Sequence, residues 1–327
     1  MKLVKWKDNP ILSPTDDKWQ NFQTFNAGAI LIDDTIHIFY RAIGEDFISR
    51  IGYAKSKDGI NIEERSSSPV FEHSYPSPFN NNRNLIPNSG GSRYGAEDPR
   101  VVRVNNDRNW RWKNPLLLSP MNGIHKNWVI FPEKIGKRYA ILHTISPEVD
   151  IEYLKNLRCP EDIESYHCPL PKFGWEMCVK GAAAPPMKTK EGWLLLFHAI
   201  GKDGYYKIGA MLLDKKNPTE IISCSNGPIL EPKENYEFSG IKPGVVYTTG
   251  AVIKNSKLLV YYGASDTYLC VAYANIDEFV ESLLEERGCY YDEDVSKKIQ
   301  RKPCFRTRPS QSLGKRSCIQ WMPGEEK

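Results

Sequence analysis

The sequence predicts an all-β protein: a five-bladed β-propeller that ends in one helix and a basic tail. Three observations lead to this prediction. Paired apolar runs recur along the chain, a second short series recurs in step with them, and helical periodicity is rare. Each repeat would supply one blade, and the blades would bury their faces against one another around a central axis.

The paired runs have the form of β-hairpins, in which a short apolar run, a polar turn and a second apolar run follow one another. Four pairs are complete, and one further segment supplies only a first strand. The complete pairs are Phe25–Ala42, Val129–Thr144, Ala183–Ala199 and Val245–Ala264, and the partial unit is Gly95–Asp107. The gap between the first two complete pairs is about twice as long as the later gaps, so the partial unit is the expected second blade.

The second series has a Pro–aliphatic–aliphatic core and lies between the paired runs. Its members are Asn9–Pro14, Ser68–His73, Asn114–Pro120 and Gly227–Pro232. A β-sandwich with coincidental hairpins is the alternative fold, but it would not explain two series that run in step. We therefore expect a propeller domain over residues 1–286 and a basic extension over 287–327.

Helical patterns occur at two places. Asp277 is a candidate N-cap for a helix whose Ile276, Phe279, Val280, Leu283 and Leu284 share one face, and this helix would end near Gly288. A weaker pattern over Glu148–Leu157 predicts a second helix.

The charge distribution excludes several classes of protein. Residues 287–327 hold ten Lys/Arg and five Asp/Glu, so the net charge of +4 belongs to the tail, and residues 1–286 are nearly neutral. A basic face for nucleic acid is therefore not predicted. No apolar run approaches the roughly 18 residues of a membrane span, and the N-terminus lacks the apolar stretch of a secretory signal. We expect no nucleic-acid or membrane partner and a cytoplasmic location.

The eight cysteines all lie in the second half of the chain and form no CxxC pair. Cys159 and Cys168, with the nearby His167, lack a zinc-binding spacing. The sequence therefore predicts no metal site, and mostly reduced thiols.

Alignment of the repeats predicts a ring of polar residues around the axis. Asn26, Asp98, Glu133, Pro185 and Thr249 take equivalent positions on the first strands, whereas Arg41, His143, His198 and Tyr262 end the second strands. Such a ring suits an anionic or polyhydroxylated ligand and acid catalysis by a buried carboxyl group. Structural interpretations stay open: Asp98 precedes a proline and could form a turn, and Arg41 or Arg50 could pair with Asp46 or Glu45.

Seven short motifs resemble, in order, those of glycoside hydrolase family 130, the β-mannoside phosphorylases. They are FNAGA (Phe25–Ala29), YR (Tyr40–Arg41), SRIGYAKSKDG (Ser49–Gly59), EDPR (Glu97–Arg100), FPEKI (Phe131–Ile135), APP…EGWLLLFH (Ala184–His198) and YYGASD (Tyr261–Asp266). The resemblance extends from about residue 8 to residue 286 and is strongest to members that act on mannosyl-N-acetylglucosamine and mannooligosaccharides.

The resemblance implies inverting phosphorolysis of β-1,4-linked mannosides to α-mannose 1-phosphate and an acceptor sugar. It implies that Asp98 is the proton donor, that Arg41, Arg50, Lys134 and His198 bind phosphate, and that Asn26, Arg100, Tyr262 and Asp266 bind sugar. Phosphate would be a substrate, no cofactor would be needed, and the protein would be a homo-oligomer. An inverting β-mannosidase and a non-catalytic carbohydrate-binding propeller are the alternatives.

Overall fold

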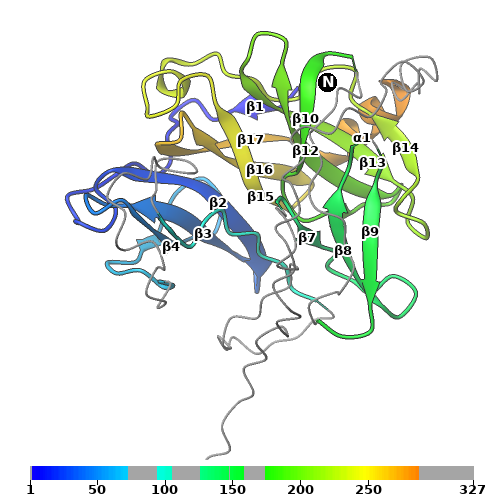
Figure 1. Cartoon of the computed structure of the whole chain (residues 1–327), viewed down its shortest axis with the longest axis horizontal. Helices are drawn as coiled ribbons and strands as arrows, with labels where there is room; N and C mark the ends of the chain where they lie inside the picture. The colour runs from blue at the N-terminus through cyan, green and yellow to red at the C-terminus, as the bar shows by residue number, and fades with distance from the viewer. Residues whose placement is uncertain (1, 73–93, 105–125, 147, 158–173, 287–327) are drawn as a thin grey trace, which may run out of the picture.

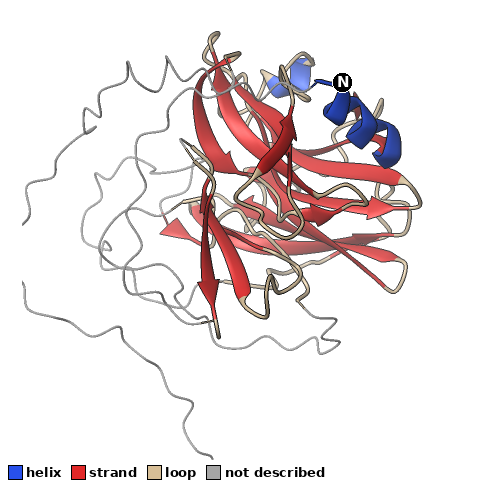
Figure 2. Cartoon of the chain, turned by 90° about the vertical axis from the view of Figure 1, so that its right-hand side faces the viewer, coloured by secondary structure: helices blue, strands red, loops and turns tan. Residues whose placement is uncertain are grey.

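The computed structural model describes residues 2–72, 94–104, 126–146, 148–157 and 174–286, and these form a β-propeller of four sheets with one α-helix. Figure 1 shows the sheets arranged around a common centre, and Figure 2 shows that strands dominate and that the helix lies at one side. The prediction of an all-β propeller is confirmed.

Each sheet is antiparallel, with the exception of one short parallel pairing in the first. The first holds β2 (Gln23–Ile32), β3 (Thr35–Ile43), β4 (Ile48–Ser56), β5 (Glu64–Arg65) and β6 (Tyr94–Gly95), in which β6 runs parallel to β4. The second holds β7 (Val129–Ile130), β8 (Tyr139–Thr144) and β9 (Asp150–Leu154). The third holds β10 (Glu176–Ala182), β11 (Met187–Lys188), β12 (Trp193–Gly201), β13 (Tyr206–Leu213) and β14 (Ile221–Cys224). The fourth holds β15 (Val246–Lys254), β16 (Lys257–Ala264), β17 (Tyr268–Asn275) and β1 (Val4–Lys5).

The predicted number of five blades is wrong for the described residues, which form four sheets. The expected second blade began at Gly95–Asp107, but its only described strand, β6, joins the first sheet by pairing Tyr94 and Gly95 with Ile48 and Ser49. Residues 96–104 continue without a strand, and the rest of that unit, 105–125, lies outside the described residues.

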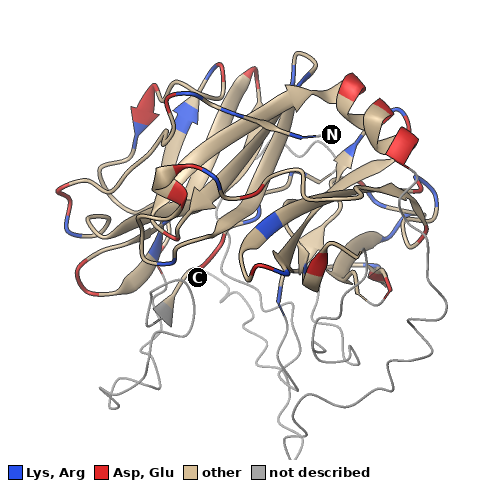
Figure 3. Ribbon diagram, turned by 90° about the horizontal axis from the view of Figure 1, so that it is seen from above, with Lys and Arg blue, Asp and Glu red and all other residues tan. Residues whose placement is uncertain are grey.

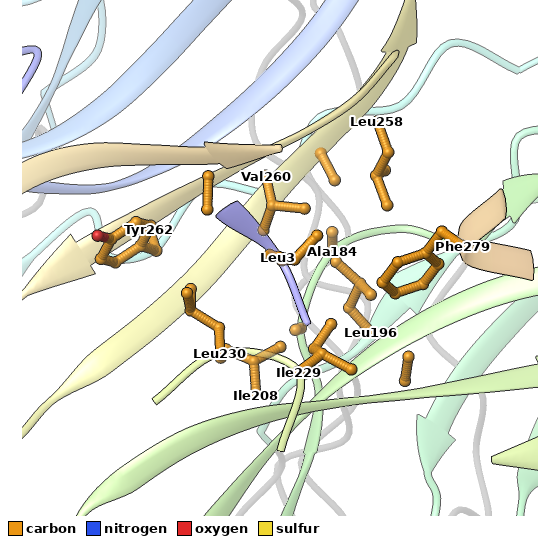
Figure 4. Close-up of a cluster of buried hydrophobic side chains, with 14 of the residues drawn as sticks. Leu3, Ala184, Leu196, Ile208, Ile229, Leu230, Leu258, Val260, Tyr262 and Phe279 are labelled. Carbon is orange, nitrogen blue, oxygen red and sulfur yellow. The ribbon is translucent and has the colours of Figure 1, made fainter. Parts of the chain in front are cut away.

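The fourth sheet is completed by the start of the chain. Val4 and Lys5 of β1 pair with Tyr273 and Ala272 of β17, so the outermost strand of the last sheet comes first in sequence. Leu3 is buried in the apolar cluster between the third and fourth sheets, together with side chains such as Leu196 and Val260 (Figure 4). This pairing closes the ring of sheets.

The first strands of the sheets converge near the centre. β15 packs against β2, and Gly250 makes this approach possible, because a Cβ there would lie 2.4 Å from the carbonyl oxygen of Ala27. His198 on β12 bonds the backbone of Thr248 on β15, which ties the third sheet to the fourth. These contacts bring the polar residues of the first strands close together near the centre of the propeller.

The C-terminal helix is confirmed as α1 (Ile276–Glu286), with Ile276, Phe279, Val280 and Leu283 buried. Its start differs from the prediction, because the Asn275 side chain, not that of Asp277, accepts hydrogen bonds from the first free N–H groups. The predicted helix over Glu148–Leu157 is wrong: this segment contains strand β9, whose pairing with β8 overrides the local pattern.

Charged residues lie mainly in the loops and near the ends of the strands, whereas most of the strand residues are uncharged (Figure 3). In the part of the chain that the structure describes, no helix could span a bilayer. Cys178 and Cys270 carry free thiols, but Cys224 is disulfide-bonded, so the expectation of reduced thiols does not hold there. The predicted extension over 287–327 lies outside the described residues.

Candidate active site

Asp98 lies at the centre of a polar cluster, on a segment anchored to the first sheet. The Ala96 N–H donates to the Ser49 carbonyl, and the Ser49 hydroxyl donates to the Ala96 carbonyl. Gly28 lets this segment lie against β2, because a Cβ there would be 2.6 Å from the Pro99 carbonyl oxygen. Asp98 itself has a positive φ of 41°, a conformation that is costly for a residue with a side chain and is common at functional sites.

The Asp98 carboxylate accepts hydrogen bonds from two neighbours. Asn26 Nδ2 lies 2.9 Å and Arg41 Nη1 3.1 Å from Asp98 Oδ1. Burial by itself would raise the pKa of Asp98. The charges of Arg41 and Arg100, together with these hydrogen bonds, outweigh burial and lower it. Asp98 is therefore an anion in the free protein at neutral pH.

Arg41 is a buried arginine whose side chain is only 1% exposed. Its Nε donates to Ser49 Oγ at 2.9 Å, its Nη2 lies 3.1 Å from Glu97 Oε1, and the guanidinium lies over the Phe25 ring. These contacts hold the cation beside Asp98 in one orientation. A buried guanidinium of this kind is a suitable partner for an anionic group.

Arg100 links the Asp98 segment to the second, third and fourth sheets. Its Nε donates to the Ala183 carbonyl at 2.8 Å, and its Nη2 donates to Asn127 Oδ1 at 3.0 Å. Asn127 Oδ1 also accepts from the Tyr247 hydroxyl at 3.0 Å. Arg100 thus has a clear structural role in bringing three sheets together around Asp98.

Asp266 supplies a second carboxyl group to the same cluster. It lies in the turn between β16 and β17, has a φ of 50°, and is 6% exposed. Burial is the main cause that raises its pKa, to about 6; the Asp98 charge adds to this effect, while Lys242 and Arg41 oppose it. The cluster therefore contains two carboxyl groups whose surroundings move their pKa values in opposite directions.

His198 is fully buried and stacks on Tyr247, with ring centroids 3.7 Å apart. Its Nε2 lies 2.7 Å from the Thr248 carbonyl oxygen, so Nε2 carries the proton and donates it. Burial, followed by the charge of Arg100, lowers the pKa of His198 to about 3. The imidazole is neutral, and its Nδ1 is a hydrogen-bond acceptor.

Three buried polar atoms in this region have no hydrogen-bond partner in the part of the chain that the structure describes: Asn26 Oδ1, His198 Nδ1 and Thr249 Oγ1. Buried polar groups in folded proteins are almost always hydrogen-bonded, because an unpaired one costs free energy. Two of the three atoms are acceptors and the third, a hydroxyl, can accept. Such a set suits a ligand that is rich in hydroxyl donors.

Bulges in the first strands explain how these residues meet. The pairing register shifts at Asn26 in β2, at Lys180 in β10 and at Thr249 in β15, so each is an extra residue in its strand. Asn127 lies just before β7 and donates to the Lys180 carbonyl at 2.9 Å. Asn26, Asp98 and Asn127 share a positive φ. The equivalent residues of the ring are therefore Asn26, Asp98, Asn127, Lys180 and Thr249.

The alignment that placed Glu133 and Pro185 on this ring is wrong, because it did not account for the bulges. Glu133 lies in the turn after β7 and pairs with Lys188 at 2.6 Å. Asn127 and Lys180 were missed, although a Gly follows or nearly follows the extra residue in three segments, Asn-Ala-Gly, Lys-Gly-Ala and Thr-Gly-Ala. A shared Gly next to a polar residue is the signal that would have found them.

Three predicted site residues lie apart from Asp98. Arg50 alternates with Arg41 across the β3–β4 pair, so it projects from the opposite face, where Asp46 and Glu72 lie 2.8 and 3.0 Å from it. Lys134 lies in the β7–β8 turn over the Tyr139 ring. Tyr262 is fully buried in the apolar cluster of Figure 4, and its hydroxyl donates to Glu237.

The structure brings together the other predicted residues: Asn26, Arg41, Asp98, Arg100, His198 and Asp266. Over the described ranges, no group of three or more His, Cys, Asp or Glu side chains is arranged to hold a metal ion. The fold and this cluster define a β-propeller whose polar site lies where the first strands of its sheets converge.

Comparisons with known proteins define the family. The family model described as β-1,4-mannooligosaccharide phosphorylase, of glycoside hydrolase family 130, matches residues 120–285. A 1,2-β-oligomannan phosphorylase from Thermoanaerobacter sp. (strain X514) is 33% identical over 83% of this chain and 97% of its own length. A β-1,2-mannobiose phosphorylase from the same organism is 31% identical over 83% and 96%. The chain belongs to glycoside hydrolase family 130, the family of the β-mannoside phosphorylases.

Solved structures support the fold. A putative glycosidase from Bacteroides thetaiotaomicron superposes with a TM-score of 0.68 at 23% identity, over 84% of this chain and 96% of the other. At this level of identity the similarity shows the fold alone.

Proposed function

We propose that the protein catalyses phosphorolysis of β-mannosides, in which inorganic phosphate attacks the anomeric carbon with inversion. The products would be α-mannose 1-phosphate and the shortened acceptor sugar. The observation that carries this proposal is the partly buried Asp98 carboxylate, held by Asn26 and Arg41 among acceptors that have no partner within the described residues. Membership of glycoside hydrolase family 130 supports it.

Asp98 is the proposed proton donor, although its pKa is lowered in the free protein. The cause of the lowering is chiefly the charge of Arg41 and Arg100. When a phosphate anion binds beside Arg41, it neutralises part of this charge and adds a negative charge next to Asp98. Both effects favour the protonated carboxyl. Substrate binding would therefore convert Asp98 from a base into an acid.

Phosphate binding is assigned to Arg41 and to Lys180. Arg41 is already oriented, and Lys180 occupies the ring position equivalent to Asn26 and Thr249. His198 takes a different role from the cationic one expected, because its Nε2–H is given to a backbone carbonyl and the ring is neutral. Its Nδ1 would accept a hydrogen bond from a sugar hydroxyl or from the P–OH of monohydrogen phosphate.

Mannose binding is assigned to Asn26, Thr249 and Asp266, whose oxygens can accept from sugar hydroxyls. Arg100 contributes by holding Asn127 and the Ala183 carbonyl in place. Arg50, Lys134 and Tyr262 receive no ligand role, because their contacts lie elsewhere. The homo-oligomer, the cytoplasmic location and the lack of a cofactor stay predictions.

The linkage specificity is proposed to be β-1,2. Two relatives above 30% identity, each covered over nearly its whole length, are named for β-1,2-linked oligomannan and mannobiose. The β-1,4 specificity expected from the sequence is the second candidate, and the description of the matching family model supports it. Synthesis from α-mannose 1-phosphate with mannose, N-acetylglucosamine and glucose as acceptors, with product linkages read by NMR, decides between the two.

Phosphate dependence tests the reaction. Release of α-mannose 1-phosphate from β-1,2- or β-1,4-mannobiose is expected with phosphate and not without it. Asp98→Asn should reduce kcat roughly 10²–10⁴-fold, whereas Asp203→Asn, which removes a surface carboxylate paired with Lys207, should not. Release of free mannose in the absence of phosphate would instead identify a β-mannosidase. Sugar binding without any turnover would identify a non-catalytic propeller.

A further inference from the structure

Asn26 is the extra residue of the β2 bulge, and it contacts Asp98 from a backbone in the left-handed region. Its φ is 43°, and the residue is only 3% exposed. Its Nδ2 donates to Asp98 Oδ1 at 2.9 Å, whereas its Oδ1 is buried and has no partner within the described residues. The Asn26 amide can serve the proposed reaction only if its plane stays turned so that both atoms keep these directions.

The strand beside Asn26 leaves room for this amide at Gly263. Gly263 of β16 pairs with Tyr247 of β15 and with Leu269 of β17, so it lies in the middle of the fourth sheet. A Cβ at Gly263 would lie 2.1 Å from Asn26 Oδ1 and 3.2 Å from Asn26 Cγ, and Cβ atoms essentially never approach another heavy atom closer than 3.0 Å. Any side chain at position 263 would therefore displace the amide.

The kind of atom that Gly263 faces separates it from two other glycines of the region. A Cβ at Gly28 or at Gly250 would meet a backbone carbonyl oxygen, at 2.6 and 2.4 Å, so these two glycines let main chains approach each other. At Gly263 the nearest atom is the end of a short side chain, and the backbone nitrogen of Asn26 is 3.1 Å away. A methyl group at Gly263 would therefore rotate the Asn26 side chain and leave the sheets nearly in place.

We propose that Gly263 is a positioning residue for the phosphorolysis: its lack of a side chain fixes the Asn26 amide with Nδ2 on Asp98 and with Oδ1 available to a mannose hydroxyl. This inference rests on the proposed function. Asn26 and Arg41 both donate to Asp98 Oδ1, so the proton that Asp98 donates would be carried by Oδ2. Loss of the Asn26 bond would let the carboxylate turn and would remove one acceptor for the sugar.

Turnover of Gly263→Ala, with Gly201→Ala as the matched control, is the first test. Gly201 ends β12, and a Cβ there would also meet the end of a polar side chain, Asp203 Oδ1 at 2.6 Å, which belongs to a carboxylate paired with Lys207. We expect kcat/KM for mannobiose to fall about 10²-fold in Gly263→Ala and to stay within about threefold in Gly201→Ala, because a misplaced group costs much of the rate of a preorganised site. Equal losses in the two variants would contradict the proposal.

A double-mutant cycle shows whether Gly263 acts through Asn26. Asn26→Gly removes the side chain, and glycine adopts a φ of 43° without strain. Because no amide is then left to displace, Gly263→Ala should cost less than about threefold in kcat/KM when it is added to Asn26→Gly. A loss as large as that in the wild-type background would mean that the methyl group disturbs the sheet itself, and the proposal would be wrong.

Hydrogen exchange tests the geometry without turnover. The Asn26 side-chain amide, recognised in ¹⁵N-labelled protein by its absence from Asn26→Gly, is buried and donates to Asp98. Its protons should exchange with water at least about tenfold faster in Gly263→Ala, and at the wild-type rate in Gly201→Ala. Unchanged exchange in Gly263→Ala would overturn the proposal. If the wild-type protein shows no phosphate-dependent turnover, the proposed function fails, while the exchange rates still test whether Gly263 positions the amide.

Discussion

Two buried polar clusters, one around Glu237 and one around Asp98, differ in how completely their atoms are paired. Glu237 is fully buried, yet its carboxylate bonds Lys5 Nζ at 2.6 Å, the Tyr262 hydroxyl at 3.1 Å and two backbone N–H groups. Around Asp98, three buried polar atoms, Asn26 Oδ1, His198 Nδ1 and Thr249 Oγ1, lack partners within the described residues. The first cluster joins β1 to the fourth sheet and serves stability, whereas the second is incomplete without a ligand.

The largest effect on the free energy of unfolding is expected at the Glu237 cluster. Lys5→Met would leave the Glu237 charge buried without its cation, at a cost of about 3–5 kcal/mol in the free energy of unfolding. Activity per folded molecule should not change. Urea unfolding measures the loss, and Lys7→Met is the control, because Lys7 pairs with Asp8 in an exposed ion pair. A cost below 1 kcal/mol would remove the distinction between the clusters.

At the Asp98 cluster, removal of a buried charged group is expected to raise the free energy of unfolding instead of lowering it. Because the folded-state pKa of Asp266 is raised to about 6, the folded protein binds more protons than the unfolded chain between about pH 4 and 6. Stability therefore falls as pH rises through this window, by up to roughly 3 kcal/mol. Asp266→Asn should recover this amount above pH 6.5 and nothing below pH 4.

Thermal unfolding of wild type and Asp266→Asn across pH 3.5–8 measures the difference. A variant that is less stable than wild type at pH 8 would show that the Asp266 carboxylate makes favourable contacts in the folded state. The Asp98 cluster would then destabilise the folded protein less than its comparison with the Glu237 cluster implies.

The smallest effect is expected at Arg50, which lies on the opposite face of the β3–β4 pair from Arg41. Its partners Asp46 and Glu72 are partly exposed, so Arg50→Gln should cost about 1 kcal/mol. The KM for phosphate should stay within twofold of wild type, whereas Arg41→Gln should raise it at least tenfold. A large rise with Arg50→Gln would restore the phosphate role that the sequence motif suggested.

Arg41 and Arg50 illustrate what the sequence could predict. The repeats located the strands, the propeller and most of the Asp98 cluster, because hydrophobic periodicity reports which runs are buried. Periodicity does not report the pairing register, however, and one residue of register decides which face of a strand a side chain occupies. Arg50 was assigned to the site through the family motif, which does not report the face of the strand, and Lys180 was missed where a bulge shifts the register. Asn127, which precedes β7, was missed as well.

Tyr262 and the blade number show a second limit. Tyr262 lies in the same motif as Asp266, but only the tertiary structure shows that its hydroxyl bonds Glu237, away from the Asp98 cluster. The fifth blade was inferred from the long interval between the first two complete pairs and from one strand-like run within it. In the described residues, the start of that run joins the first sheet by β6. Both the role of Tyr262 and the number of blades thus depend on contacts between residues that lie far apart in the sequence.

The pairing of β1 with β17 also has a consequence for how the protein is made. Val4 is synthesised before all the other strands described here, but its partner Tyr273 is synthesised only after them. During synthesis, Leu3 and Lys5 must stay available while the intervening sheets form, and Glu237 has no cation until the ring closes. The last cooperative step of folding is therefore expected to be the return of the first strand.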